Sequence, residues 1–218
     1  MPSEQRSLIR DILQIHPSEV SRTALAFTYL FTAVGSFIVA RITRTVLFLE
    51  IPNYREQLTL TYLAVALTVS AAMFCYSKIE RRLRRDKTNS ITLILLIIVT
   101  LVFRVALSSS SHVIYWLFYI WVEVFGAFLI VQFWTLAAEI FHSRQAKRLF
   151  AIIGGGGILS NIVFGFGTRS YVSTIGTENL LFVVVGCLLI SLAMTQALGK
   201  DAKVELTQAL LRTPTKSL

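Results

Sequence analysis

Residues 90–107 read SITLILLIIVTLVFRVAL and carry a single charged side chain, Arg104, in a run of 18 residues. As an α-helix with a rise of 1.5 Å per residue, this run extends about 27 Å, close to the roughly 30 Å hydrocarbon core of a bilayer. Backbone polar groups in lipid must be hydrogen-bonded within the protein, and a membrane β-barrel would instead need alternating strands of about ten residues. The run therefore predicts a transmembrane helix.

Five similar runs accompany it. Of the 218 residues, 55% are apolar and 15% are charged, whereas a soluble domain carries about 25% charged residues. We expect an all-α polytopic membrane protein with an amphipathic cytoplasmic segment at 1–22, a transmembrane domain at 23–198 and a cytoplasmic tail at 199–218. The six predicted spans are residues 24–49, 58–77, 90–107, 113–140, 149–168 and 180–198.

Basic residues are distributed unequally between the two sides of these spans. Sixteen of the 21 Lys and Arg residues lie at the termini or in the second and fourth loops, and two lie on the opposite side. Because cytoplasmic loops carry the excess of Lys and Arg, we expect both termini to be cytoplasmic. The net charge of +9 is then a topological signal, and no nucleic-acid partner is expected.

Two cysteines, Cys75 and Cys187, lie inside apolar runs, and the three histidines show no spacing typical of metal ligands. No nucleophile–base pair stands at a predicted membrane interface. We therefore expect a protein that is not an enzyme and has no cofactor and no metal site.

A run of four glycines, residues 154–157, falls in the fifth span and lacks the Lys-Ser/Thr that follows a phosphate-binding loop. Small residues in membrane helices allow close packing of neighbouring helices. Gly157, Asn161 and Gly165 recur every four residues, and we expect their shared face to be the packing face.

Charged residues inside the spans are the candidate functional residues, because a charge near the bilayer centre is costly and usually faces a polar cavity. Arg41 and Arg44 stand three residues apart on one helix face. Either the first helix ends at Ala40 and both arginines extend to the headgroups, or the helix continues and they face a cavity.

Glu123 lies ten residues into the fourth span, too deep for its short side chain to reach water along the helix. It must be protonated, paired or in a hydrated cavity, and Arg41 or Arg44 is the natural partner. A purely structural ion pair between two helices is the alternative. Arg104, one turn before the end of its span, is expected to extend to the headgroups.

The stretch FYIWVEVFGAFLIVQFWTLAAEIFHSRQAKRLFAIIGGGG, residues 118–157, resembles the ATP/ADP translocases of plastids and intracellular bacteria, within the major facilitator superfamily. IHPSEVSR, before the first span, and ARITRTVLFL, within it, also look like segments of that family. The residues of the longer stretch that carry the resemblance are Phe118-Tyr119, Glu123, Gly126, Phe133-Trp134, Ala137, Ala146-Lys147-Arg148 and the glycine run.

The resemblance implies the amino-terminal six-helix half of a major facilitator-type fold, whose first and fourth helices line a central cavity. It places Arg41, Arg44 and Glu123 on the path of a nucleotide (ATP or ADP) or other phosphorylated anion, which moves by alternating access. Implied partners are the lipid bilayer and a second six-helix unit, either a copy of this chain or another chain. The implied location is a bacterial inner membrane or an organelle envelope.

The sequence also departs from the family. Thr45 stands where an Asp usually follows the basic residue, and family members have twelve spans where this sequence predicts six. The alternatives are therefore a transport-inactive half-carrier that serves as a structural or scaffold subunit of a membrane complex, and a piece of a longer carrier. Exchange and symport both remain open.

Overall fold

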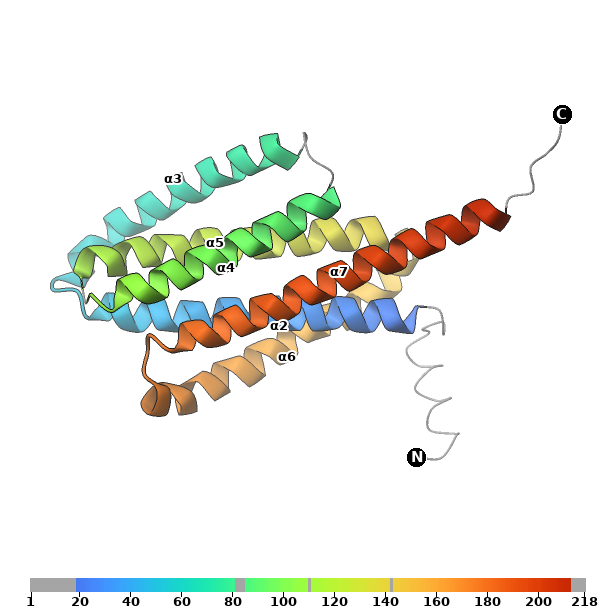
Figure 1. The fold of residues 1–218 in the computed structure, drawn as a ribbon. Coiled ribbons are helices and arrows are strands. Elements are labelled where there is room, and N and C mark those ends of the chain that lie inside the picture. Colours follow the sequence, from blue (N-terminus) through green and yellow to red (C-terminus); the bar gives the residue numbers. More distant parts are fainter. Residues whose placement is uncertain (1–18, 81–84, 110, 142, 213–218) are drawn as a thin grey trace.

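The computed structural model describes residues 19–80, 85–109, 111–141 and 143–212, and in this part of the chain it contains six α-helices and no strand (Figure 1). Each helix is long and apolar enough to cross a membrane. The chain is therefore an all-α, multi-pass integral membrane protein. The helices are α2 (Val20–Leu49), α3 (Tyr54–Glu80), α4 (Arg85–Leu107), α5 (His112–Ile140), α6 (Ser143–Ile175) and α7 (Leu180–Arg212).

The predicted spans agree with these helices in number and in position. Their ends differ from the apolar spans of the structure by at most four residues, for example 24–49 against Val20–Leu49. Helix α7 continues well past its apolar span, through most of the predicted tail, as far as Arg212. Residues 1–18, which hold nearly all of the predicted amphipathic segment, lie outside the described residues.

Helix α2 is continuous over 30 residues and passes through Arg41 and Arg44 without a break. The alternative in which it ends at Ala40 is therefore wrong. The physical reason is the apolar sequence after Arg44, which keeps the chain in the membrane, where an unwound backbone would leave its polar groups unpaired.

Helix α2 is also the centre of the bundle, because α5, α6 and α7 all pack against it (Figure 1). In its most apolar stretch, 56% of the residues are buried, against 6% for α3, which packs mainly on α5 at the outside of the bundle. The charged residues of α2 thus belong to the most enclosed helix of the protein.

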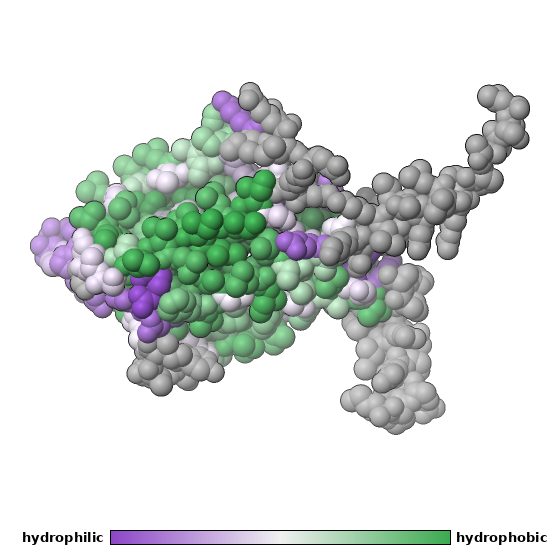
Figure 2. Space-filling view, viewed as in Figure 1, coloured by the Kyte–Doolittle hydropathy of each residue, from purple (hydrophilic) through white to green (hydrophobic). Residues whose placement is uncertain are grey.

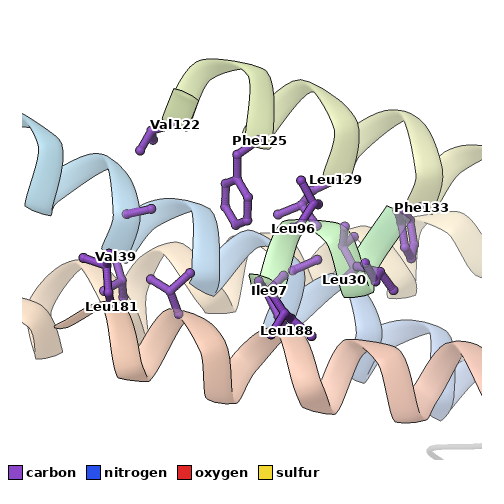
Figure 3. Close-up of a cluster of buried hydrophobic side chains, with 14 of the residues drawn as sticks. Leu30, Val39, Leu96, Ile97, Val122, Phe125, Leu129, Phe133, Leu181 and Leu188 are labelled. Atoms are coloured by element: carbon purple, nitrogen blue, oxygen red, sulfur yellow. The ribbon is translucent and has the colours of Figure 1, made fainter. Parts of the chain in front are cut away.

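Large apolar side chains from four helices meet in the middle of the bundle (Figure 3). Phe125 and Leu129 of α5 point toward α2 and α4, where Leu30 and Leu96 lie, and Leu188 of α7 closes the cluster. Lipid is as apolar as these side chains, so tight van der Waals packing holds the helices together more than the hydrophobic effect does. The outward faces are also apolar, and hydrophilic residues gather at the ends of the bundle (Figure 2), which fits contact with a lipid bilayer.

Close packing of α6 on α2 occurs at one glycine of the predicted run. A Cβ atom added to Gly156 would lie 2.8 Å from the backbone oxygen of Phe27, too close for any side chain. One turn later, the hydroxyl of Ser160 donates a hydrogen bond of 2.7 Å to the backbone oxygen of Phe31. The prediction of tight helix packing is confirmed at this point.

The predicted packing face, however, is wrong by one residue. A Cβ atom at Gly157 is in ordinary contact distance of α2, one at Gly165 would meet no described atom within 4 Å, and Asn161 is exposed. One residue corresponds to a rotation of about 100° around a helix axis, and consecutive glycines leave that rotation undetermined.

Candidate functional site

Arg44 is buried between α2 and α5, with 4% of its surface exposed. Its Nη1 atom forms an ion pair with Oε1 of Glu123, and its guanidinium carbon lies 4.0 Å from the centre of the Tyr119 ring. Tyr119 and Glu123 are four residues apart, so they lie on the same face of α5. One arginine from α2 is therefore held by an anionic group and an aromatic face from α5.

The pairing explains why a guanidinium can occupy this position. Removing an arginine from water costs several kcal/mol, and a carboxylate together with the face of a tyrosine offsets this cost. Nη1 of Arg44 is engaged by Glu123, whereas Nε donates no hydrogen bond to any described residue. The group is held by charge, and its Nε–H remains a directed donor for a further acceptor.

The pair is enclosed on the arginine side and open on the carboxylate side. The side chain of Arg44 is 5% exposed, whereas that of Glu123 is 30% exposed. An anion that approaches from this open side meets Glu123 first and must displace it to reach Arg44.

Arg41 lies outside this pair. It is exposed, and it lines a cavity of about 340 Å³ between α2, α5 and α6, together with Phe37, Gly126 and Asn161. The ring of Phe37 occupies the space that a side chain at position 126 would fill. Because α2 and α5 are antiparallel, Arg41 and Gly126 both lie about one turn beyond the Arg44–Glu123 pair, on the side of the bundle where α2 begins. The cavity therefore adjoins the pair.

Of the three candidate residues, the structure thus joins Arg44 with Glu123 and places Arg41 beside them. The role of Tyr119 was missed from the sequence, where it appeared only as one of two aromatic residues. Its spacing of four residues from Glu123 is the signal that could have indicated it.

Arg104 has side-chain partners that the sequence did not indicate. Its Nη2 atom donates a hydrogen bond of 2.6 Å to Asn179, and its Nη1 atom lies 3.3 Å from a carboxylate oxygen of Glu178. Both partners belong to the connection between α6 and α7. The arginine therefore anchors the end of α4 to a loop of the same protein.

A further polar link joins the beginnings of α2 and α6. Glu19 forms an ion pair with Arg148, and the side-chain amide of Gln145 donates a hydrogen bond of 2.9 Å to the same carboxylate. Glu19 belongs to the segment before the first predicted span, and Arg148 lies just before the fifth, so the link ties the starts of these two spans together.

No family model, curated protein or solved structure matches this chain. The geometry of the Arg44–Glu123 pair and its cavity is therefore the basis for a functional interpretation. Within the described residues, no group of three or more His, Cys, Asp or Glu side chains could hold a metal ion.

Proposed function

We propose that the chain is one six-helix unit of a membrane carrier for a nucleotide or another phosphorylated anion. The observation that carries the proposal is the buried Arg44–Glu123 pair, closed around the arginine and open at the carboxylate. Ionisable groups within membrane spans usually mark a substrate or ion pathway because their burial is costly.

The chemistry of the pair suits a phosphate group. A guanidinium binds phosphate oxygens through two parallel charge-assisted hydrogen bonds; Nε of Arg44 is an unused donor, and Nη1 becomes one when Glu123 moves away. In the empty state Glu123 neutralises the arginine. When an anion arrives, the carboxylate gives way, and when the anion leaves, it returns, so that Arg44 is never an unpaired charge in the membrane.

The neighbouring cavity supports the same reading. It is lined mostly by apolar side chains, with Arg41 and Asn161 as polar groups, and its volume of about 340 Å³ lies at the small end of the range for ligand sites. The anionic part of a substrate fits beside the arginines and its less polar part against α2 and α5. The resemblance to ATP/ADP translocases makes ATP or ADP the first substrates to test.

Alternating access needs a second six-helix unit, and we propose a copy of this chain or a second chain for that role. The excess of basic residues at the termini and in the second and fourth loops supports an orientation with both termini on the cytoplasmic side of a bacterial inner membrane, or on the corresponding side of an organelle envelope. A scaffold subunit that has lost transport is the second candidate, favoured by the fact that Glu123 already neutralises Arg44.

Anion binding to the purified chain in lipid nanodiscs distinguishes the carrier from the scaffold subunit. The wild type and its variants are titrated with labelled ATP, ADP and inorganic phosphate. Arg44→Ala should bind these anions at least tenfold more weakly than the wild type. Arg44→Lys should be intermediate, because it keeps the charge but loses the planar fork. Arg104→Ala is the matched control, since its partners lie in a loop, and it should bind nearly as the wild type does.

Equal, small effects of Arg44→Ala and Arg104→Ala would refute the site. A wild-type protein that binds none of the three anions, yet purifies in a stable stoichiometric complex with unrelated membrane proteins, would favour the scaffold. Uptake of labelled nucleotide into proteoliposomes then tests transport itself.

A further inference from the structure

A second polar cluster lies where α3, α4 and α5 meet, away from the Arg44–Glu123 pair. Gln132 of this cluster follows Glu123 by nine residues, about 13 Å along the helix axis. The cluster borders a partly open cavity of about 10 Å³, close to the space that one water molecule or small ion needs. The residues that line it are Tyr76, Thr88, Asn89, Gln132, Thr135, Leu136 and Glu139.

Two of these side chains are buried amides without partners. Gln132 is 1% exposed and Asn89 is 6% exposed, and neither the amide oxygen nor the amide nitrogen of either residue forms a hydrogen bond with a described residue. Burying such a group unpaired costs its full desolvation penalty, which is why buried polar side chains normally have partners. Two unpaired amides at one small cavity indicate an occupant that satisfies them.

The ligand atoms around the cavity identify the class of occupant. Six of the seven lining residues carry a side-chain oxygen, as hydroxyl, amide or carboxylate, and none carries sulfur or an imidazole nitrogen. Oxygen-only sites suit hard cations. Glu139 is the one carboxylate among the seven lining residues, whereas Ca²⁺ sites gather several, so the lining favours a monovalent ion over Ca²⁺.

We propose that this cavity binds one small monovalent cation, with sodium as the ion of matching size. The amide oxygens of Asn89 and Gln132 coordinate it together with hydroxyl oxygens and Glu139. The Tyr29 hydroxyl of α2 lies beside Asn89 and can accept a hydrogen bond from its amide nitrogen, which leaves the amide oxygen to face the ion. Glu139 lies in the last turn of α5 and is exposed, so the ion enters from that end of the bundle.

Ion binding at this cluster is independent of nucleotide binding. Use of the ion to drive uptake rests on the proposed function, and it would make the carrier a symporter. The site also joins α3, the least buried helix, to α4 and α5, so an ion there changes the stability of the bundle whether or not the protein transports anything.

Thermal unfolding of the purified full chain in detergent tests the proposal. At constant ionic strength, replacing choline chloride by NaCl should raise the unfolding midpoint in a saturable manner, by about 3–6 °C at ten times the dissociation constant. LiCl should share part of the effect and KCl should not. Equal midpoints in NaCl and choline chloride would mean that a water molecule alone occupies the cavity, and an equal effect of KCl would contradict the size match; either result overturns the proposal.

Variants locate the effect. Gln132→Leu removes the amide oxygen and an unpaired polar group together, so it should abolish the sodium shift while the midpoint in choline chloride stays the same or rises. Glu139→Gln should weaken the sodium dependence at least tenfold. Asn161→Leu, the same kind of change at an exposed amide on α6, is the matched control and should keep the full shift. A shift that persists in Gln132→Leu refutes this location.

The outcome is separable from that of the proposed function. A wild-type protein that binds no nucleotide but shows the sodium shift would refute the carrier and leave the ion site standing. An Arg44→Ala protein that loses nucleotide binding and keeps the sodium shift would support both sites.

Discussion

The strength of the Arg44–Glu123 pair can be worked out from its burial. Removing one partner of a fully buried ion pair costs about 3–5 kcal/mol, because the other charge is left uncompensated, and an exposed pair contributes about 0–1 kcal/mol. Arg44 is nearly as buried as the first case requires, but Glu123 keeps 30% of its side-chain surface exposed, so water can replace part of the interaction. We therefore expect Glu123→Leu to destabilise the fold by about 2–3 kcal/mol.

A double-mutant cycle separates the free energy of the ion pair from the packing contribution of each side chain. Arg44→Met should cost less than Glu123→Leu, because the carboxylate it leaves behind is partly hydrated, and the double variant should cost less than the sum of the two. From the same burial, the coupling free energy should be about 1.5–2.5 kcal/mol. Unfolding in mixed micelles titrated with a denaturing detergent measures all four proteins under one condition.

Arg104 and Glu178 provide the matched pair for comparison. Their side chains are 23% and 34% exposed, and their closest atoms are 3.3 Å apart, so their coupling should be about 0.5–1 kcal/mol. A coupling at Arg44–Glu123 no larger than at this control would refute the argument that burial and an aromatic neighbour make the first pair special.

Two further predictions concern the contact between α2 and α6. Gly154→Ala should raise the stability by up to about 1 kcal/mol through helix propensity, since its Cβ meets nothing within 4 Å. Gly156→Ala should lower it by about 1–3 kcal/mol through overpacking. Thermal unfolding midpoints that shift in the same direction in both variants would contradict the packing face. Glu19→Ala should cost about 1–2 kcal/mol, and Arg148→Ala should add little to it, because both remove the same link; fully additive losses would show that the ion pair does not form.

The number and the positions of the helices follow from the sequence alone. In a bilayer every backbone polar group must be paired within the protein, so an apolar run of the right length can only be a helix, and its ends are set by where apolar residues stop. Residues 90–107 show this, since α4 ends at Leu107 as predicted. Candidate charges could be found in the same way, because any charge inside such a run is costly.

The tertiary structure decided how each helix is rotated about its axis, and with it which of these residues form a site. Arg41 and Arg44 are alike in sequence terms, yet packing of α2 against its neighbours buries the second and exposes the first. The packing glycine of α6 was misplaced by one residue for the same reason. Asn89 and Gln132 come from different helices, and no local sequence pattern connects them. They share a cavity because α4 and α5 pack together. Which helices become neighbours is decided only when the whole bundle assembles.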